Sequence, residues 1–125
     1  MVADDRKYTK SHEWVMIDGD VATVGVTEYA AAELGDVVFL DLPEPGVEIS
    51  RGEPVGTIET VKAVEDLYTP VTGEVLDVNQ AVVDTPELVN NDPLDAGWLI
   101  KVRLGEPEEV DALLTAAEYD ALLGG

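Results

Sequence analysis

Cysteine is absent from this 125-residue sequence, and histidine occurs only once, at His12. Without cysteine the chain has no disulfides, no thiolate metal ligands and no cysteine nucleophile. A zinc or iron site needs several nitrogen or sulfur ligands, which one histidine does not supply. We therefore expect no metal site.

Long apolar runs are also missing. No run reaches the ~18 to 20 residues that a membrane-spanning helix needs. The first ten residues, MVADDRKYTK, contain no apolar segment of the kind found in secretory signals. The expected compartment is therefore the cytoplasm.

Basic residues are few. The chain has 7 lysines and arginines against 27 acidic residues, which gives a formal net charge of -20 and a pI of about 4.1. Such a surface repels nucleic acid and anionic membranes. Either a basic partner or a salt-rich cytoplasm would explain the acidity, because salt screens repulsion between carboxylates. The acids are spread along the whole chain, which favours the salt-rich cytoplasm.

Hydrophobic residues make up 46% of the chain, so it can bury a core despite its charge. The length suits a single domain, residues 1–125. Two β-rich runs, HEWVMI and VATVGV, flank the turn sequence Asp-Gly-Asp and predict a hairpin. The remaining predicted strands are short and bounded by glycine or proline: DVVFLDLP, EPVGTIET, AVEDLYTP, GEVLDVNQ and GWLIKVRL.

Helix signals are local and brief. TEYAAAELG predicts a short helix with Thr27 as its cap and Gly35 at its end. In DTPELVN, Pro86 stands near an expected helix start, after the possible caps Asp84 and Thr85. Many short strands with helical ends indicate a mainly β fold, a small sandwich or barrel.

The C-terminal segment, about residues 106–123, is predicted to be helical. Thr115 and Glu118 have the spacing of a capping box for a second short helix, which Gly124 can terminate. An apolar stripe lies on one predicted helical face: Val110, Leu113, Leu114 and Ala117. We expect this stripe to pack on the domain itself rather than to dock a partner.

Lys62 is one of only four lysines and stands in the segment GTIETVKAVEDLY, with acids on both sides. Taken alone, it is most simply a solvated surface charge. Local rules leave its structure open: Val61, Val64 and Tyr68 fit a helical face, whereas the many β-branched residues favour a strand. Val61 and Lys62 are also not the residues that a two-residue hairpin turn prefers.

Four segments of the sequence resemble one known family, the glycine cleavage system H proteins. They are YTKSHEWV, GVTEYAAAELGDVVFLDLPEPG, GTIETVKAVEDLYTPVTGEV and LVNNDPLDAGWLIKV, which occur in the family's order and cover about residues 8–104. The resemblance implies a barrel-sandwich hybrid of the lipoyl and biotinyl carrier type over that range, followed by a helical C-terminal tail. It also places the lysine at the tip of a hairpin.

The resemblance implies that Lys62 carries a lipoyl group through an amide bond. Val61 and Ala63, with Glu59 three residues before the lysine, resemble the H protein pattern rather than that of biotin carriers or 2-oxo acid dehydrogenases. These three neighbours would help a lipoate ligase or lipoyltransferase recognise the site, although a simple solvated acid is the more economical interpretation of Glu59. Gly46 and Gly73, sixteen residues before and eleven after the lysine, resemble the turn glycines of lipoyl domains.

The implied function is that of a carrier and not an enzyme. Such a carrier takes the aminomethyl group of glycine from a pyridoxal-phosphate glycine decarboxylase to a folate-dependent aminomethyltransferase, and dihydrolipoyl dehydrogenase then reoxidises it. A monomer suits that work. Two alternatives stay open: a lipoate donor in a lipoyl relay, and an unmodified acidic interaction domain that only keeps the carrier fold.

Ser11, His12 and Glu13 have the residue types of a hydrolytic triad. Neighbouring residues on a strand point to opposite faces, so they are not expected to form one, and a structural role is expected for His12. Trp14 and Trp98 lie in β-rich runs and are expected to pack in or near the core.

Overall fold

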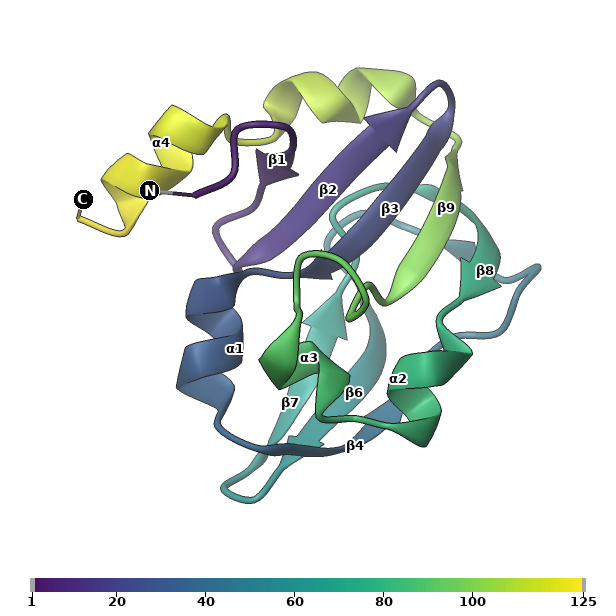
Figure 1. The fold of residues 1–125 in the computed structure, drawn as a ribbon. Coiled ribbons are helices and arrows are strands. Elements are labelled where there is room, and N and C mark those ends of the chain that lie inside the picture. Colours follow the sequence, from purple (N-terminus) through teal and green to yellow (C-terminus); the bar gives the residue numbers. More distant parts are fainter. Residues whose placement is uncertain (1, 125) are drawn as a thin grey trace.

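The computed structural model describes residues 2–124, so the two terminal residues of the expected 1–125 domain lie outside it. Two antiparallel sheets form the fold (Figure 1). Sheet A has the strand order β1 Lys7–Tyr8, β2 Glu13–Asp18, β3 Val21–Val26, β9 Ile100–Leu104, β8 Gly73–Val78 and β5 Glu48–Ile49. Sheet B has the order β4 Val37–Asp41, β6 Pro54–Thr60 and β7 Val64–Tyr68.

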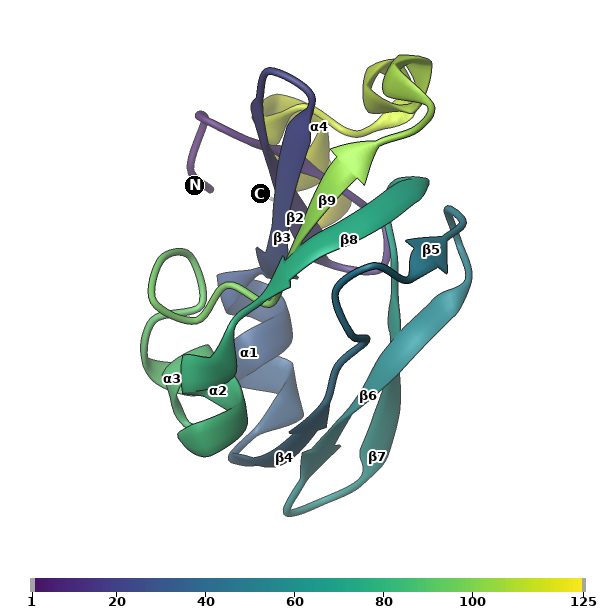
Figure 2. The same ribbon diagram turned by 90° about the vertical axis from the view of Figure 1, so that its right-hand side faces the viewer.

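The main core lies between the two sheets. Val24 and Val102 of sheet A and Leu40 and Ile58 of sheet B belong to one buried apolar cluster. Figure 2 shows the β6–β7 hairpin extending away from sheet A. The expected mainly β fold with short helices is therefore confirmed, with two sheets rather than a closed barrel.

The β2–β3 hairpin forms where the sequence predicts it. Gly19 supplies the positive φ of 62° that its turn requires. Trp14 of β2 lies directly opposite Gly25 of β3 in the register. The indole covers that glycine so closely that a Cβ there would meet the ring at 2.5 Å.

Helix α1, Glu28–Leu34, also matches the prediction. The Thr27 side chain accepts a hydrogen bond from the Ala30 amide, and Gly35 ends the helix with a φ of 73°. The next helix was not predicted from the sequence. Helix α2, Gln80–Asp84, begins where the Asn79 side chain caps it by accepting from the Ala81 amide.

Helix α3, Leu88–Asn91, follows Pro86 as the sequence predicts. Asp84 and Thr85 do not cap it, because they form the end of α2 and its C-cap. Glu87 occupies the N-cap position without a side-chain hydrogen bond. Pro86 thus lies in the link between two short helices.

The C-terminal segment is not one helical face. It consists of a 3₁₀ helix, Pro107–Ala112, a break, and helix α4, Ala116–Leu122, which starts with the predicted Thr115–Glu118 capping box. Within the break, Leu114 and Tyr8 exchange two backbone hydrogen bonds of 2.8 Å. Leu113 joins the main core and Ala117 is exposed, so the predicted stripe was wrong as a single face. The expected packing on the domain itself is confirmed, chiefly through Tyr119.

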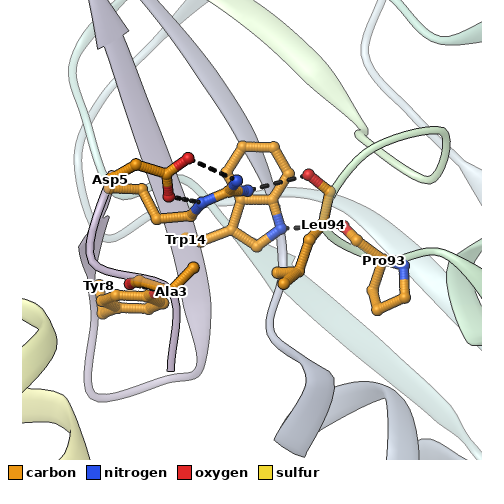
Figure 3. A network of polar contacts seen from close by, with 7 residues as sticks. Ala3, Asp5, Tyr8, Trp14, Pro93 and Leu94 are labelled. Carbon is orange, nitrogen blue, oxygen red and sulfur yellow. Dashed lines mark hydrogen bonds and ion pairs between the residues drawn. The ribbon is translucent and has the colours of Figure 1, made fainter. Parts of the chain in front are cut away.

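The N-terminal residues are held by a polar network around Trp14 (Figure 3). The indole nitrogen donates to the Pro93 carbonyl oxygen at 2.9 Å, and the Arg6 guanidinium lies 4.6 Å from the ring centroid. Arg6 also donates to the Leu94 carbonyl oxygen and pairs with Asp5. As expected, Trp14 is buried. It forms a second buried cluster with Tyr8 and Tyr119, and the half-buried Trp98 packs against this cluster. Among residues 2–124, no helix is long and apolar enough to cross a membrane.

Candidate functional site

Figure 1 shows the protruding end of the β6–β7 hairpin. Lys62 lies at this tip, between Val61 and Ala63, because β6 ends at Thr60 and β7 begins at Val64. The Thr60 side chain shapes this tip: its hydroxyl oxygen accepts from the amides of Lys62 at 3.2 Å and Ala63 at 3.1 Å. The Thr60 amide closes the turn by donating to the Ala63 carbonyl oxygen at 2.8 Å. The helix-compatible interpretation of this segment was therefore wrong, because cross-strand pairing and the threonine override the local apolar spacing.

The tip leans against the end of α1. The Val61 amide donates to the Asp36 carbonyl oxygen at 3.1 Å, and the Lys62 ammonium donates to the Glu33 carbonyl oxygen at 3.1 Å. Carbonyl groups at a helix C-terminus lack partners within the helix and favour a positive charge. A Cβ at Gly35 would approach the Lys62 side chain to 3.1 Å, so the glycine leaves it room.

A cleft of about 440 Å³ opens beside the tip, between α1 and the β6–β7 hairpin. One wall consists of α1 residues and the other of hairpin residues, and the segment around His12 closes one part of it. The walls include Tyr29, Ala30, Glu33, Ile58, Lys62, Ala63, Glu65 and Leu67. Lys62 is thus both at an exposed tip and at the border of a partly apolar cleft.

Glu13 places a carboxyl group in the cleft wall although only 6% of the residue is exposed. Its Oε1 atom accepts hydrogen bonds from the hydroxyls of Ser11 at 2.6 Å and Thr9 at 2.8 Å. Burial raises the pKa of Glu13, and these two hydrogen bonds oppose that rise. The second carboxylate oxygen has no hydrogen-bond partner within residues 2–124, so it can accept a donor from a molecule in the cleft.

His12 also lines the cleft, in a left-handed conformation with a φ of 69°. Its Nδ1 atom lies 2.7 Å from the Tyr119 hydroxyl, and its ring packs at 4.6 Å against Tyr29. Burial lowers the pKa of His12, while nearby Glu33 raises it. Since Ser11 contacts Glu13 and His12 contacts Tyr119, Ser11, His12 and Glu13 do not form a hydrolytic triad, and the contact of His12 with Tyr119 agrees with the structural role expected for it.

The predicted neighbours of Lys62 lie in different surroundings. Val61 is 67% exposed at the tip, whereas Ala63 lines the cleft. Glu59 is exposed and pairs across the sheet with Phe39 and Val64, both of which are also exposed. Glu59 therefore stands in a mainly apolar row on the outer face of sheet B.

The two predicted turn glycines differ. Gly46 lies in the turn before β5 with a φ of 94°. Gly73 is not a turn residue: it begins β8 and pairs with Ile49 and Leu104. Any Cβ at Gly73 would collide with the backbone oxygen of Arg103, so close strand packing requires the glycine there.

Among the described residues 2–124, no group of three or more histidines and acids is placed to hold a metal ion.

The sequence analysis did not predict the cleft. The one sequence feature that pointed to it is Ser-His-Glu at 11–13, where an acid stands next to a buried tryptophan.

Comparisons with known proteins agree with this arrangement. The family model described as Glycine cleavage H-protein matches residues 6–124. This chain belongs to that family. It is 54% identical over 121 residues to a protein named glycine cleavage system H protein from Nostoc punctiforme, covering 97% of this chain and 94% of the relative. The fold matches a crystal structure of a glycine cleavage system H protein from Mycobacterium marinum with a TM-score of 0.91 and 42% identity, over 99% of this chain and 100% of the other.

Membership of the H-protein family assigns the general function. The chain is a lipoyl carrier of the glycine cleavage system, and its family carries lipoate covalently on a lysine. It is a component of that system and not itself a catalytic enzyme. Its partners belong to the same system.

Proposed function

We propose that Lys62 is the lysine that carries the lipoyl group. The observation that supports this most is its position: a lysine at a protruding hairpin tip that also borders a cleft. A modifying enzyme must surround the amine, and the exposed tip allows this from several sides. The dithiolane of a lipoyl group would supply the redox-active sulfur atoms, which a chain without cysteine lacks.

The same proposal assigns a role to the cleft. Its apolar walls suit the hydrocarbon part of a lipoyl arm, and Glu13 offers a carboxylate oxygen that can accept hydrogen bonds from an ammonium group. An aminomethyl cargo carries such an ammonium group and is open to hydrolysis. The cleft would exclude water from this cargo, while Glu13 would hold its nitrogen.

In this account the chain carries the aminomethyl group of glycine between enzymes. A pyridoxal-phosphate glycine decarboxylase would load it, a folate-dependent aminomethyltransferase would unload it, and dihydrolipoyl dehydrogenase would restore the disulfide. A lipoate ligase or lipoyltransferase would recognise the tip through Glu59, Val61 and Ala63. The exposed row of Phe39, Glu59 and Val64 beside the lysine supports such recognition.

The organisation proposed for the chain is one lipoyl-carrier domain, with its core at about 8–104 and C-terminal helices at about 106–123. The stacking of Tyr119 on Tyr8, with ring centroids 4.7 Å apart, supports a single unit, because it joins the two ends of the described chain. A cytoplasmic monomer stays a prediction of the sequence.

The experiment is intact mass analysis with peptide mapping of the chain coexpressed with a lipoate ligase in lipoate-replete cells, beside Lys62→Arg and Lys101→Arg variants. We expect one lipoyl increment on the peptide containing Lys62, absent only from Lys62→Arg. An unmodified wild-type chain would support the acidic interaction domain instead. A modified chain that never accepts an aminomethyl group from the decarboxylase would favour the lipoyl relay.

A further inference from the structure

The elbow between α1 and β4, residues 35–37, is the surface on which the lysine tip leans. Its middle residue, Asp36, accepts the hydrogen bond from the Val61 amide, and Val37 pairs with Thr60 at the end of the hairpin. Gly35, with a positive φ of 73°, and Asp36 lie between the two elements, and Val37 is the first residue of β4. This short link is also held by contacts from outside α1 and β4.

Asn90 of helix α3 supplies such contacts. Its Nδ2 group donates to the Gly35 carbonyl oxygen at 2.6 Å, and its Oδ1 atom accepts from the Val37 amide at 2.9 Å. One side-chain amide thus binds the backbone on both sides of Asp36. A side-chain amide offers this donor and this acceptor on neighbouring atoms without any change of protonation state.

Asn90 lies on a helix that is anchored in the core. Its neighbour Val89 is completely buried in the main core, and α3 packs against α1. The backbone N–H of Asn90 donates to the Glu87 carbonyl oxygen at 3.0 Å, within the helical turn. The Asn90 side chain, on a helix anchored by the buried Val89, thus holds the elbow in one place.

We propose that Asn90 is a positioning residue for the lysine hairpin. By fixing the elbow at 35–37, it sets the root of the arm at Lys62 against the α1 wall of the cleft, although Asn90 does not line the cleft. Loss of the side-chain amide of Asn90 would let the hairpin tip separate from α1. Water would then enter between the α1 wall and the hairpin wall of the cleft. This role rests on the proposed function of the cleft, namely protection of the aminomethyl cargo.

The first test measures amide hydrogen exchange in the unmodified chain, for wild type, Asn90→Ala and the control Asn91→Ala on the same helix. We expect the Val61 amide to exchange about tenfold faster in Asn90→Ala, as for the loss of one hydrogen bond, while core Val102 does not change. An equal increase at Val61 and Val102, no increase, or an equal effect of Asn91→Ala would overturn the proposal. Should Asn90→Ala fail to fold, Asn90→Asp keeps the acceptor for Val37 and loses only the donor to Gly35.

The second test measures the release of formaldehyde and ammonia by hydrolysis of the loaded aminomethyl cargo from the same lipoylated variants. We expect release to be several-fold faster in Asn90→Ala and unchanged in Asn91→Ala, with equal lipoylation of all variants. Unchanged release in Asn90→Ala would overturn the positioning role even if exchange at Val61 rises. If wild type cannot be loaded, the proposed function fails, whereas the exchange test still decides whether Asn90 holds the tip.

Discussion

Tyr119 of the C-terminal helix lies 2.7 Å from His12 of the cleft wall through its hydroxyl group, although 107 residues separate them in the sequence. The same hydroxyl lies 2.8 Å from the Thr27 hydroxyl, which also caps α1. Tyr119 is completely buried. The C-terminal helix is thus connected to both the base of the cleft and the start of its α1 wall.

Tyr119→Phe should destabilise the fold, because it removes the hydroxyl that contacts both the half-buried His12 and the buried Thr27. We expect a loss of about 1 to 3 kcal/mol in the free energy of unfolding, measured by urea denaturation. Tyr29→Phe serves as the control, since Tyr29 is 43% exposed. If the two variants lose the same stability, the hydrogen bonds of Tyr119 do not hold the C-terminal helix in place.

Glu13→Gln should leave the stability of the fold intact at neutral pH but weaken the protection of the cargo. Burial raises the pKa of Glu13 above its ordinary value of 4.5. Protonation of the folded state therefore favours folding at pH values below 4.5, and this contribution to stability is lost as the pH rises through the folded-state pKa. Gln keeps an oxygen that can accept from Ser11 and Thr9. The variant should therefore be at least as stable as wild type at neutral pH, and this advantage should shrink as the pH falls towards 4.5.

In the loaded carrier, the same Glu13→Gln change should speed hydrolysis of the aminomethyl cargo, because the amide no longer offers a charged acceptor to its ammonium group. The measurement is the rate of ammonia release at neutral pH, with the exposed Glu59→Gln as control. Equal rates in wild type and Glu13→Gln would remove Glu13 from the account of cargo binding.

Gly25→Ala should disturb the packing of Trp14. The new Cβ would lie 2.5 Å from the indole ring, and Trp14 is only 1% exposed, so either the ring or the β2–β3 pair must shift. Overpacking of this kind costs about 1 to 3 kcal/mol. Gly105→Ala is the control, because its Cβ would meet the nearest atom at 3.5 Å. Thermal melting curves that coincide for Gly25→Ala and wild type would show that the indole can move freely.

Salt should stabilise the chain. Within residues 2–124 there are two ion pairs, Arg6 with Asp5 and Arg103 with Glu74, whereas the whole sequence contains 27 acidic residues. Most carboxylates therefore repel one another, and added ions screen that repulsion. The melting temperature should rise steadily from low to molar potassium chloride. A melting temperature independent of salt would exclude the proposed adaptation to a salt-rich cytoplasm.

Local signals were sufficient where a single residue decides the structure. The Thr27 cap, the Asp-Gly turn and the Thr115–Glu118 box all lie where the sequence predicts them. Local signals failed where the groups that form a hydrogen bond are distant in the sequence. The Asn79 cap begins α2 unexpectedly, and its Nδ2 group also binds the Ala96 and Trp98 carbonyl oxygens across the fold.

The candidate site shows the same division. The resemblance to a family placed Lys62 at a hairpin tip, whereas periodicity alone also fitted a helix. The cleft could not be predicted, because it forms only when α1, the hairpin and the Ser11–Glu13 segment come together. The apolar stripe at 110–117 failed because Leu114 pairs with Tyr8, near the other end of the chain, and this pairing breaks the helix.

The most direct measurement is peptide mapping of the lipoylated chain after incubation with glycine and the glycine decarboxylase. The account predicts that lipoyl group and aminomethyl cargo are found together on the peptide that contains Lys62, and that Lys62→Arg carries neither. Cargo or lipoate on a peptide containing Lys7, Lys10 or Lys101, with Lys62 unmodified, would contradict it.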